Sequence, residues 1–131
     1  MKKGFTLLEL IIVIIVLGIL ATLGFTQYTR VVERGRTAEA KTVLGQIRTA
    51  QQAYYLEYGS YAASIDPLLV NAPQTTCAST HYFIYRADNL NCEAVRCTAS
   101  SGGGKTPAAA TAYNVTLNYT TGAFGGTSGY Y

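Results

Sequence analysis

An apolar stretch near the start of the chain limits its possible folds more than any other feature. Glu9 is the only charged residue between Phe5 and Phe25, and nearly all the other side chains are apolar. At about 1.5 Å per residue, a helix of this length crosses the roughly 30 Å hydrocarbon core of a bilayer. The stretch therefore predicts one membrane-spanning helix.

Positive charges flank this span unevenly. Lys2 and Lys3 precede it directly, whereas the first positive residues after it are Arg30 and Arg34. The positive-inside rule then favours a cytoplasmic N-terminus, with the body of the chain outside. Residues 21–24 match poorly the small-x-small cleavage site that a secretory signal would have there. The span is therefore expected to stay attached to the chain.

Glu9 needs an explanation of its own. An ionised acid costs about 2.5 to 3.5 kcal/mol at the centre of a span, so such a residue is a functional candidate by default. In the first helical turn, however, the positive end of the helix dipole favours an acid by about 0.3 to 1 kcal/mol. Alternatively, cleavage between Gly4 and Phe5 would create a positive α-amine one helical turn from Glu9. Both explanations are open at this point.

The sequence KGFTLLE at residues 3–9, followed by the apolar helix, resembles the class III signal of bacterial type IV prepilins and the related pseudopilins. The resemblance is close as far as about Arg30 and looser as far as Pro67. It implies that a prepilin peptidase cuts after Gly4 and that the new N-terminal Phe5 is N-methylated. It also implies that Glu9 meets the Phe5 amine of a neighbouring subunit in a filament.

Helical periodicity continues beyond the span. In residues 31–58 apolar side chains recur at steps of three or four, as in an amphipathic helix. The expected stripe is Val43, Ile47, Ala50, Tyr54 and Tyr58, with Ala40 and Leu44 beside it. Gly59 suits the left-handed conformation that ends many helices. We therefore expect one helix from Phe5 to Tyr58.

Two glycines are candidate points of helix flexibility. Relatives with this signal usually have a proline late in the span, and here Thr26 takes that place. Gly18 and Gly24 each cost a helix about 1 kcal/mol relative to alanine. The sequence therefore indicates these two residues as the places where the helix could loosen on assembly.

The rest of the chain predicts a small antiparallel sheet. Candidate strands are 82–86, 94–98 and 112–119, and the turn-prone segment 88–91 joins the first two. The loop 100–104 is expected to be flexible, and residues 122–131 form a glycine-rich tail. The predicted fold class is α+β, a long helix packed on an antiparallel sheet of three or four strands, which is the pilin fold.

Tyrosine is unusually common, with 11 residues and no tryptophan. Most of the tyrosines are expected to fill the core between helix and sheet. The core candidates are Tyr54, Tyr58, Tyr82, Tyr85, Tyr113 and Tyr119. Tyr130 and Tyr131 are expected at the surface, where they could serve subunit contacts or adhesion.

Three cysteines in an exported domain predict one disulfide and one free thiol, with three possible pairings. If the hairpin turns near Asn89, Cys77 comes closer to Cys97 than to Cys92, which favours the pair Cys77 and Cys97. A zinc site would have only His81 as a further ligand, so no metal or cofactor is expected. His81 is also a poor partner for a catalytic nucleophile, and we do not expect an enzyme.

Three parts are expected along the chain: a leader at residues 1–4, a transmembrane and filament-core helix at 5–30, and an extracytoplasmic domain at 31–131. Net charge is +3, and without Lys2 and Lys3 the ten basic residues fall to eight against seven acidic ones. This near-neutrality argues against nucleic acid as the main ligand, although it does not exclude one.

The predicted function is that of a type IV pilus subunit. It would be held in the inner membrane by a single N-in pass, and the inner-membrane assembly machinery would then extract it into a helical surface filament. Motility, cell adhesion and secretion all use such filaments. Two alternatives are a pseudopilin of a type II secretion system and a monomeric, membrane-tethered binding module. Only the binding module would have no use for Glu9.

Overall fold

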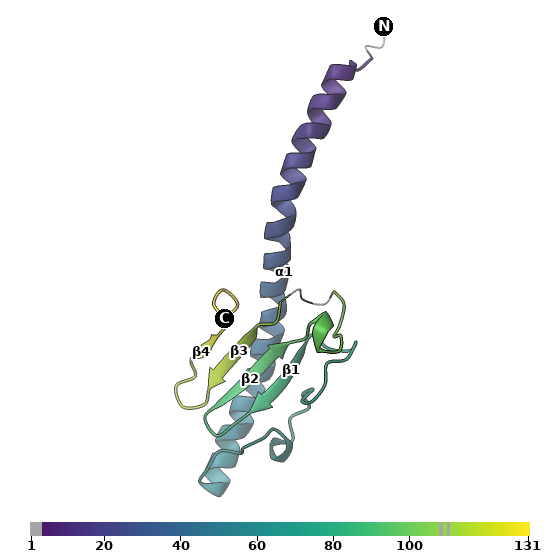
Figure 1. The fold of residues 1–131 in the computed structure, drawn as a ribbon. Helices are drawn as coiled ribbons and strands as arrows, with labels where there is room; N and C mark the ends of the chain where they lie inside the picture. Colours follow the sequence, from purple (N-terminus) through teal and green to yellow (C-terminus); the bar gives the residue numbers. More distant parts are fainter. Residues whose placement is uncertain (1–3, 108, 110) are drawn as a thin grey trace. The chain divides into compact units, whose positions relative to one another are not determined.

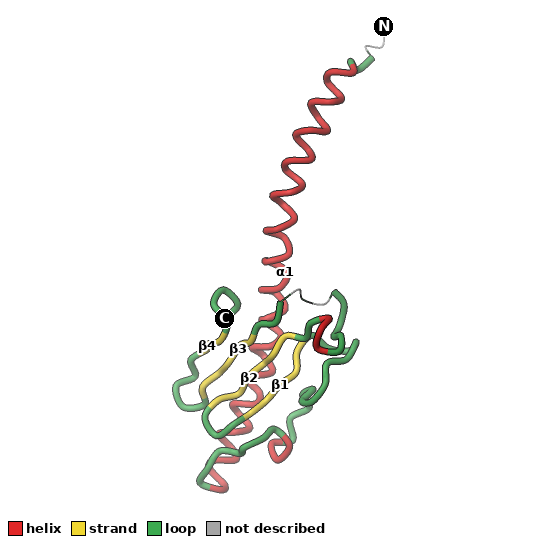
Figure 2. The backbone as a smooth tube through the Cα atoms, viewed as in Figure 1, coloured by secondary structure: helices red, strands yellow, loops and turns green. Residues whose placement is uncertain are grey.

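The computed structural model describes residues 4–107, 109 and 111–131, without the side chain of Thr26 (Figure 1). The chain divides into two compact units, Met1–Arg34 and Gly35–Tyr131. Figure 2 distinguishes helices, strands and loops by colour. Their order is α1 (Leu7–Tyr58), η1 (Asp66–Leu68), β1 (Phe83–Ala87), β2 (Asn91–Arg96), η2 (Ala99–Ser101), β3 (Asn114–Asn118) and β4 (Phe124–Gly126). The α+β fold class and the single long helix are as predicted.

Helix α1 ends where the sequence predicts and begins slightly later. Its last residue is Tyr58, and Gly59 follows with φ of 73° while its N–H donates to the carbonyl oxygen of Tyr55. A residue with a Cβ adopts this left-handed conformation only at a cost, which explains the glycine. The helix begins at Leu7 rather than Phe5, because Thr6 serves as its cap, as described below.

The buried residues of α1 form a stripe that is rotated around the helix axis from the predicted stripe and overlaps it at Ile47. Its fully buried residues are Thr37, Ala40, Leu44, Ile47 and Gln51. Val43, Ala50 and Tyr54 are only partly buried, and Tyr58 is 60% exposed, so its assignment to the core was wrong. The shift arises because Gln51 can be buried once its amide has hydrogen-bond partners, whereas sequence patterning treats glutamine as a surface residue.

Four antiparallel strands form the sheet in the order β1-β2-β3-β4. The carboxylate of Asp88 accepts hydrogen bonds from the backbone N–H groups of Leu90 and Asn91, each at 2.7 Å, and so tightens the first turn. As a result β2 already begins at Asn91, earlier than the expected 94–98 strand. Its register places Cys92 opposite both Ala87 and Leu117.

The glycine-rich C-terminal tail supplies the fourth strand of the sheet, within the three or four strands that the sequence predicts. It contains β4, which pairs Gly125 with Thr116 and Gly126 with Val115. Gly126 has φ of 117°, and a Cβ there would collide with the carbonyl oxygen of Asn114. The glycines thus permit close strand pairing as well as flexibility.

The core lies between the buried stripe of α1 and one face of the sheet. Alternate residues of β2 and β3 point to it, including Cys92, Ala94, Val115 and Leu117. Of the tyrosines expected there, Tyr85, Tyr113 and Tyr119 are buried, and Tyr54 and Tyr82 lie at its edge. Tyr130 also joins it, since its ring stacks on that of Tyr113 at 4.0 Å between centroids, while Tyr131 is 52% exposed.

One disulfide joins Cys77 to Cys97, the pair favoured by the position of the turn. It ties the segment before β1 to the end of β2. Cys92 is the remaining thiol and is fully buried, with its Sγ 3.6 Å from the carbonyl oxygen of Leu44. Burial raises the pKa of the Cys92 thiol to about 12, so the group stays protonated at neutral pH.

Removing the disulfide is expected to destabilise the globular unit. The bridge closes a loop with a sequence separation of 20, for which chain entropy predicts a loss of about 3 kcal/mol in the free energy of unfolding. Urea unfolding of the full chain in detergent, followed by circular dichroism, would compare wild type with a Cys77→Ser, Cys97→Ser double variant. Reductant should lower wild-type stability to that of the variant and leave the variant unchanged. Equal stability of oxidised wild type and variant would contradict the prediction.

Candidate assembly site at the start of the helix

Glu9 and Thr6 form a reciprocal cap at the beginning of α1. The Thr6 N–H donates to Glu9 Oε2 at 2.9 Å, and the Thr6 hydroxyl donates to the same oxygen at 2.7 Å. In return the Glu9 N–H donates to Thr6 Oγ1 at 3.2 Å. This is a capping box, in which threonine at the cap and glutamate three residues later satisfy backbone N–H groups that the first turn leaves unpaired.

The cap uses only one of the two oxygens of the Glu9 carboxylate. Within the described part of the chain, both hydrogen bonds to the carboxylate end on Oε2, and the side chain is exposed. The other oxygen, Oε1, is therefore available to a further donor. Capping and pairing with an amine are thus compatible, although the sequence offers them as alternatives.

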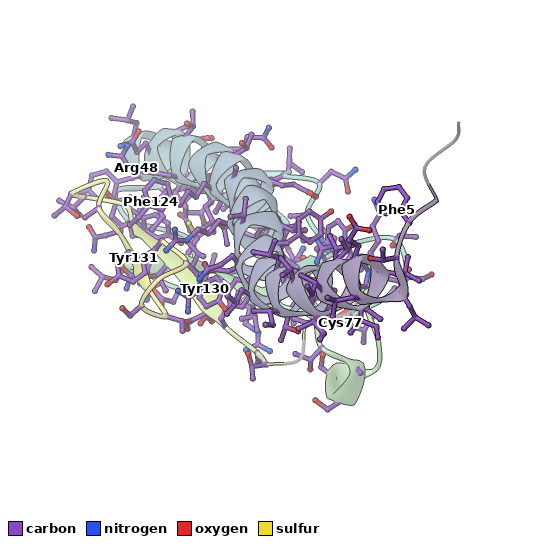
Figure 3. All side chains as sticks on the ribbon, turned by 90° about the horizontal axis from the view of Figure 1, so that it is seen from above. Phe5, Arg48, Cys77, Phe124, Tyr130 and Tyr131 are labelled. Carbon is purple, nitrogen blue, oxygen red and sulfur yellow. A yellow bond between two sulfur atoms is a disulfide. The ribbon has the colours of Figure 1, made fainter. Side chains whose placement is uncertain are left out.

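Phe5 and Gly4 precede the cap outside the helix. Phe5 is 87% exposed, and Figure 3 shows its ring beyond the first turn of α1. A cut between Gly4 and Phe5 would leave both residues of the capping box on the mature chain. The new α-amine would lie one residue before Thr6.

The apolar part of α1 is exposed over its whole length. Its large side chains, from Leu7 to Phe25, are between 40% and 75% exposed. By length and composition, α1 is the one helix among the described residues that could cross a membrane. Apolar surface of this extent must be covered by lipid or by other protein chains.

Gly18 and Gly24 lie within unbroken α-helix. The carbonyl oxygen of Gly18 also accepts a hydrogen bond from the Thr22 hydroxyl at 2.9 Å, a back-bond that often accompanies slight bending. A Cβ added at either glycine would meet nothing within 4 Å, so packing inside the chain does not require glycine there. Their role as points of flexibility stays a prediction.

The candidates for other chemistry lie apart from this site. His81 forms hydrogen bonds with Thr80, with Ala78 and with the carbonyl oxygen of Thr76. Cys92 is enclosed in the core, and no group of three His, Cys, Asp or Glu side chains with metal-binding geometry occurs in the described residues. Sequence reasoning missed Thr6, although the Thr-x-x-Glu spacing of a capping box is visible in the sequence.

Two protein-family models match the chain. The first is described as the prokaryotic N-terminal methylation motif and covers residues 1–25, which include Gly4, Phe5 and Glu9. The second is described as type IV pilin-like G and H and covers residues 37–128, more than half of the chain. The chain belongs to the type IV pilin family. This type IV pilin therefore shares with its family both the N-terminal motif and the globular region.

Similar proteins carry corresponding descriptions. The pilin is 38% identical over 61 residues to the type IV major pilin protein PilA of Myxococcus xanthus. The matched region covers 47% of this chain and 28% of PilA. It is 39% identical over 57 residues to the type IV major fimbrial protein FimA of Dichelobacter nodosus, 44% of this chain and 36% of FimA. With fimbrial protein EcpC of Eikenella corrodens it shares 34% identity over 89 residues, 61% of this chain and 58% of EcpC. The pilin thus spans 28% to 58% of the length of these relatives.

Proposed function

We propose that this pilin is the structural subunit of a type IV pilus. Its relatives include proteins described as a major pilin and as a major fimbrial protein, and the methylation motif covers the proposed processing site. Before assembly the subunit sits in the inner membrane with its N-terminus in the cytoplasm. After assembly it forms part of a helical filament on the cell surface.

The observation that carries this proposal is the exposed apolar half of α1. Exposing some twenty apolar side chains to water would cost tens of kcal/mol, at about 1.5 to 3 kcal/mol each. Lipid covers them in the membrane, and the same helix from other copies covers them in a filament. Because lipid tails are as apolar as leucine side chains, this transfer provides little specificity by itself.

Processing completes the assembly site. We propose residues 1–4 as a leader that prepilin peptidase removes after Gly4, residues 5–30 as the span and filament core, and residues 31–131 as the extracytoplasmic domain. The N-methylated amine of Phe5 then offers a positive charge to Glu9 of a neighbouring subunit, whose Oε1 is open to it. A subunit in the wrong stagger leaves that carboxylate unpaired in a dry core, at a cost of several kcal/mol.

Filaments sheared from cells test this function. Electron microscopy should show thin filaments containing the pilin, and mass spectrometry should find a chain that starts at Phe5 and carries one extra methyl group. Deletion of the prepilin peptidase should leave a chain that starts at Met1, retained in the membrane. A protein that is soluble, begins at Met1 and forms no filament in wild-type cells would overturn the proposal.

A further inference from the structure

The two ends of the globular unit carry opposite charge. At the end where β1 begins and β2 ends, the upper end of the sheet in Figure 1, three cations surround the ring of Tyr82. Arg36 Cζ lies 4.7 Å, Arg96 Cζ 5.0 Å and Lys105 Nζ 5.0 Å from the ring centroid. We call Arg36, Arg96 and Lys105 the Tyr82 cation cluster. It brings together residues from α1, from β2 and from the loop that follows η2.

Backbone contacts fix this cluster in place. Arg96 is 1% exposed and donates hydrogen bonds to the carbonyl oxygens of Tyr82, Cys97 and Pro107 at 2.9 to 3.1 Å. The backbone N–H of Lys105 donates to the carbonyl oxygen of His81 at 2.9 Å, while the residue itself is exposed. An aromatic face attracts cations without neutralising them. The positive charge of the cluster therefore extends from the buried Arg96 through the half-buried Arg36 to the exposed Lys105, its outermost member.

Acidic residues gather at the other end of the unit. We call Glu57, Asp66 and Asp88 the acidic end. Glu57 lies in the last turn of α1, Asp66 opens η1, and Asp88 makes the turn between β1 and β2, all at the lower end in Figure 1. Among the described residues, Glu39 on α1 is the acid beside the cation cluster. At the acidic end, Arg86 lies opposite Glu93 in the sheet, and Arg48 donates to the carbonyl oxygen of Tyr119 next to the Asp88 turn, so these further charges add two cations and one anion. Each end thus keeps an excess of about two charges.

Arg36 and Glu57, one residue from each group, cannot pair within one chain. Helix α1 runs from Arg36 at one end to Glu57 at the other, which is about 30 Å of helix at 1.5 Å per residue. That separation is several times the Debye length of about 8 Å at physiological salt. Any direct pairing between them joins two copies.

We propose that the Tyr82 cation cluster of one subunit docks on the acidic end of a second copy of this pilin in the filament. The inference rests on the proposed function, because an open helical filament needs two different surfaces on each subunit that fit one another. The matched excess of opposite charge meets that need on both surfaces, whereas a nucleic acid bound at the cation cluster would leave the acidic end without a partner. Exposed pairs of this kind set register and orientation more than affinity.

Zero-length cross-linking tests the contact in assembled filaments. A water-soluble carbodiimide joins an amine directly to a carboxylate, so sheared wild-type filaments should yield peptides linking Lys105 to Glu57 or to Asp66. The link to Glu57 is intermolecular, because about 30 Å of helix separates Glu57 from Arg36, which contacts the same Tyr82 ring as Lys105. Lys105→Arg keeps the charge but has no reactive amine, and should retain filaments while losing these links. Filaments in which Lys41 forms cross-links but Lys105 never joins the acidic end would overturn the inference.

A charge swap tests whether the contact matters for assembly. Lys105→Glu and Glu57→Lys should each lower the yield of sheared filament on the order of tenfold, because a repelling pair replaces an attractive one. Combining the two should restore the yield to within about twofold of wild type. Lys41→Glu is the matched control, since it makes the same charge change at a lysine that packs on Phe124 outside both charged groups, and it should leave the yield unchanged. Immunoblots should show equal amounts of every variant in the membrane.

The outcomes separate this inference from the proposed function. Normal filaments from Lys105→Glu, or a double variant no better than its parents, would overturn the docking contact and leave the pilus assignment standing. Absence of filaments from wild-type cells under pilus-forming conditions would overturn both.

Discussion

Glu9→Gln is expected to abolish surface filaments while leaving the pilin in the membrane. Glutamine at the third position of a helix still completes a capping box with Thr6, because its side-chain oxygen accepts the same hydrogen bonds. It carries no charge, however, and cannot neutralise the amine of a neighbouring Phe5. Filament yield by shearing and electron microscopy should fall at least tenfold, as expected for a lost buried charge pair. Immunoblots of membranes should show normal amounts of the protein.

Thr6→Ala is the complementary variant. It removes the hydroxyl that bonds Glu9 in both directions but leaves the charge. Loss of the cap should cost about 1 kcal/mol of helix stability and reduce filament yield only moderately. If Glu9→Gln assembled normally while Thr6→Ala did not, Glu9 would be a capping residue alone, and its proposed pairing with Phe5 would be wrong.

Gln51→Leu should produce the largest loss of stability in the globular unit. The Gln51 amide donates to the carbonyl oxygen of Ala62 at 2.8 Å, accepts from its N–H at 2.8 Å, and donates to the Tyr119 hydroxyl at 3.3 Å. Leucine fills a similar volume but leaves the buried Ala62 groups without partners, at about 1 to 3 kcal/mol each. The free energy of unfolding should therefore fall by about 4 kcal/mol, measured by urea unfolding of the full chain in detergent.

Gln52→Leu is the matched control for this variant. The neighbouring glutamine is exposed on the same helix, so its replacement should change the free energy of unfolding by less than about 0.5 kcal/mol. Similar losses from both substitutions would show that added apolar surface, rather than the Ala62 contacts, causes the effect.

Features that depend on neighbouring residues in the chain were predictable. The apolar span, the end of α1 at Gly59 and the hairpin turn near Asn89 all follow from local patterning. The Thr6 and Glu9 cap is local too, because the Thr-x-x-Glu spacing of a capping box lies within four consecutive residues. Glu9 itself was identified because an acid in an apolar run is costly wherever the helix lies.

Apart from the disulfide, features that depend on distant partners were not predictable. Gln51 is buried because the chain returns to it at Ala62 and Tyr119, and β4 forms because the glycines of the tail allow close pairing with β3. Arg96 is buried against Tyr82, Cys97 and Pro107, although its sequence position suggested an ordinary strand residue. In each case a polar or flexible residue finds partners that only the folded chain supplies.

By itself the sequence determined that this chain has a long helix with an apolar first half, one acid near its start and a small α+β domain. Those properties follow from side-chain hydrophobicity and local backbone preference, which act over a few residues. Only the tertiary structure decided which side chains of α1 are buried against the sheet. It also decided that Arg36, Arg96 and Lys105 lie around Tyr82. The physical reason is that burial of polar groups and placement of charges depend on partners far apart in the chain.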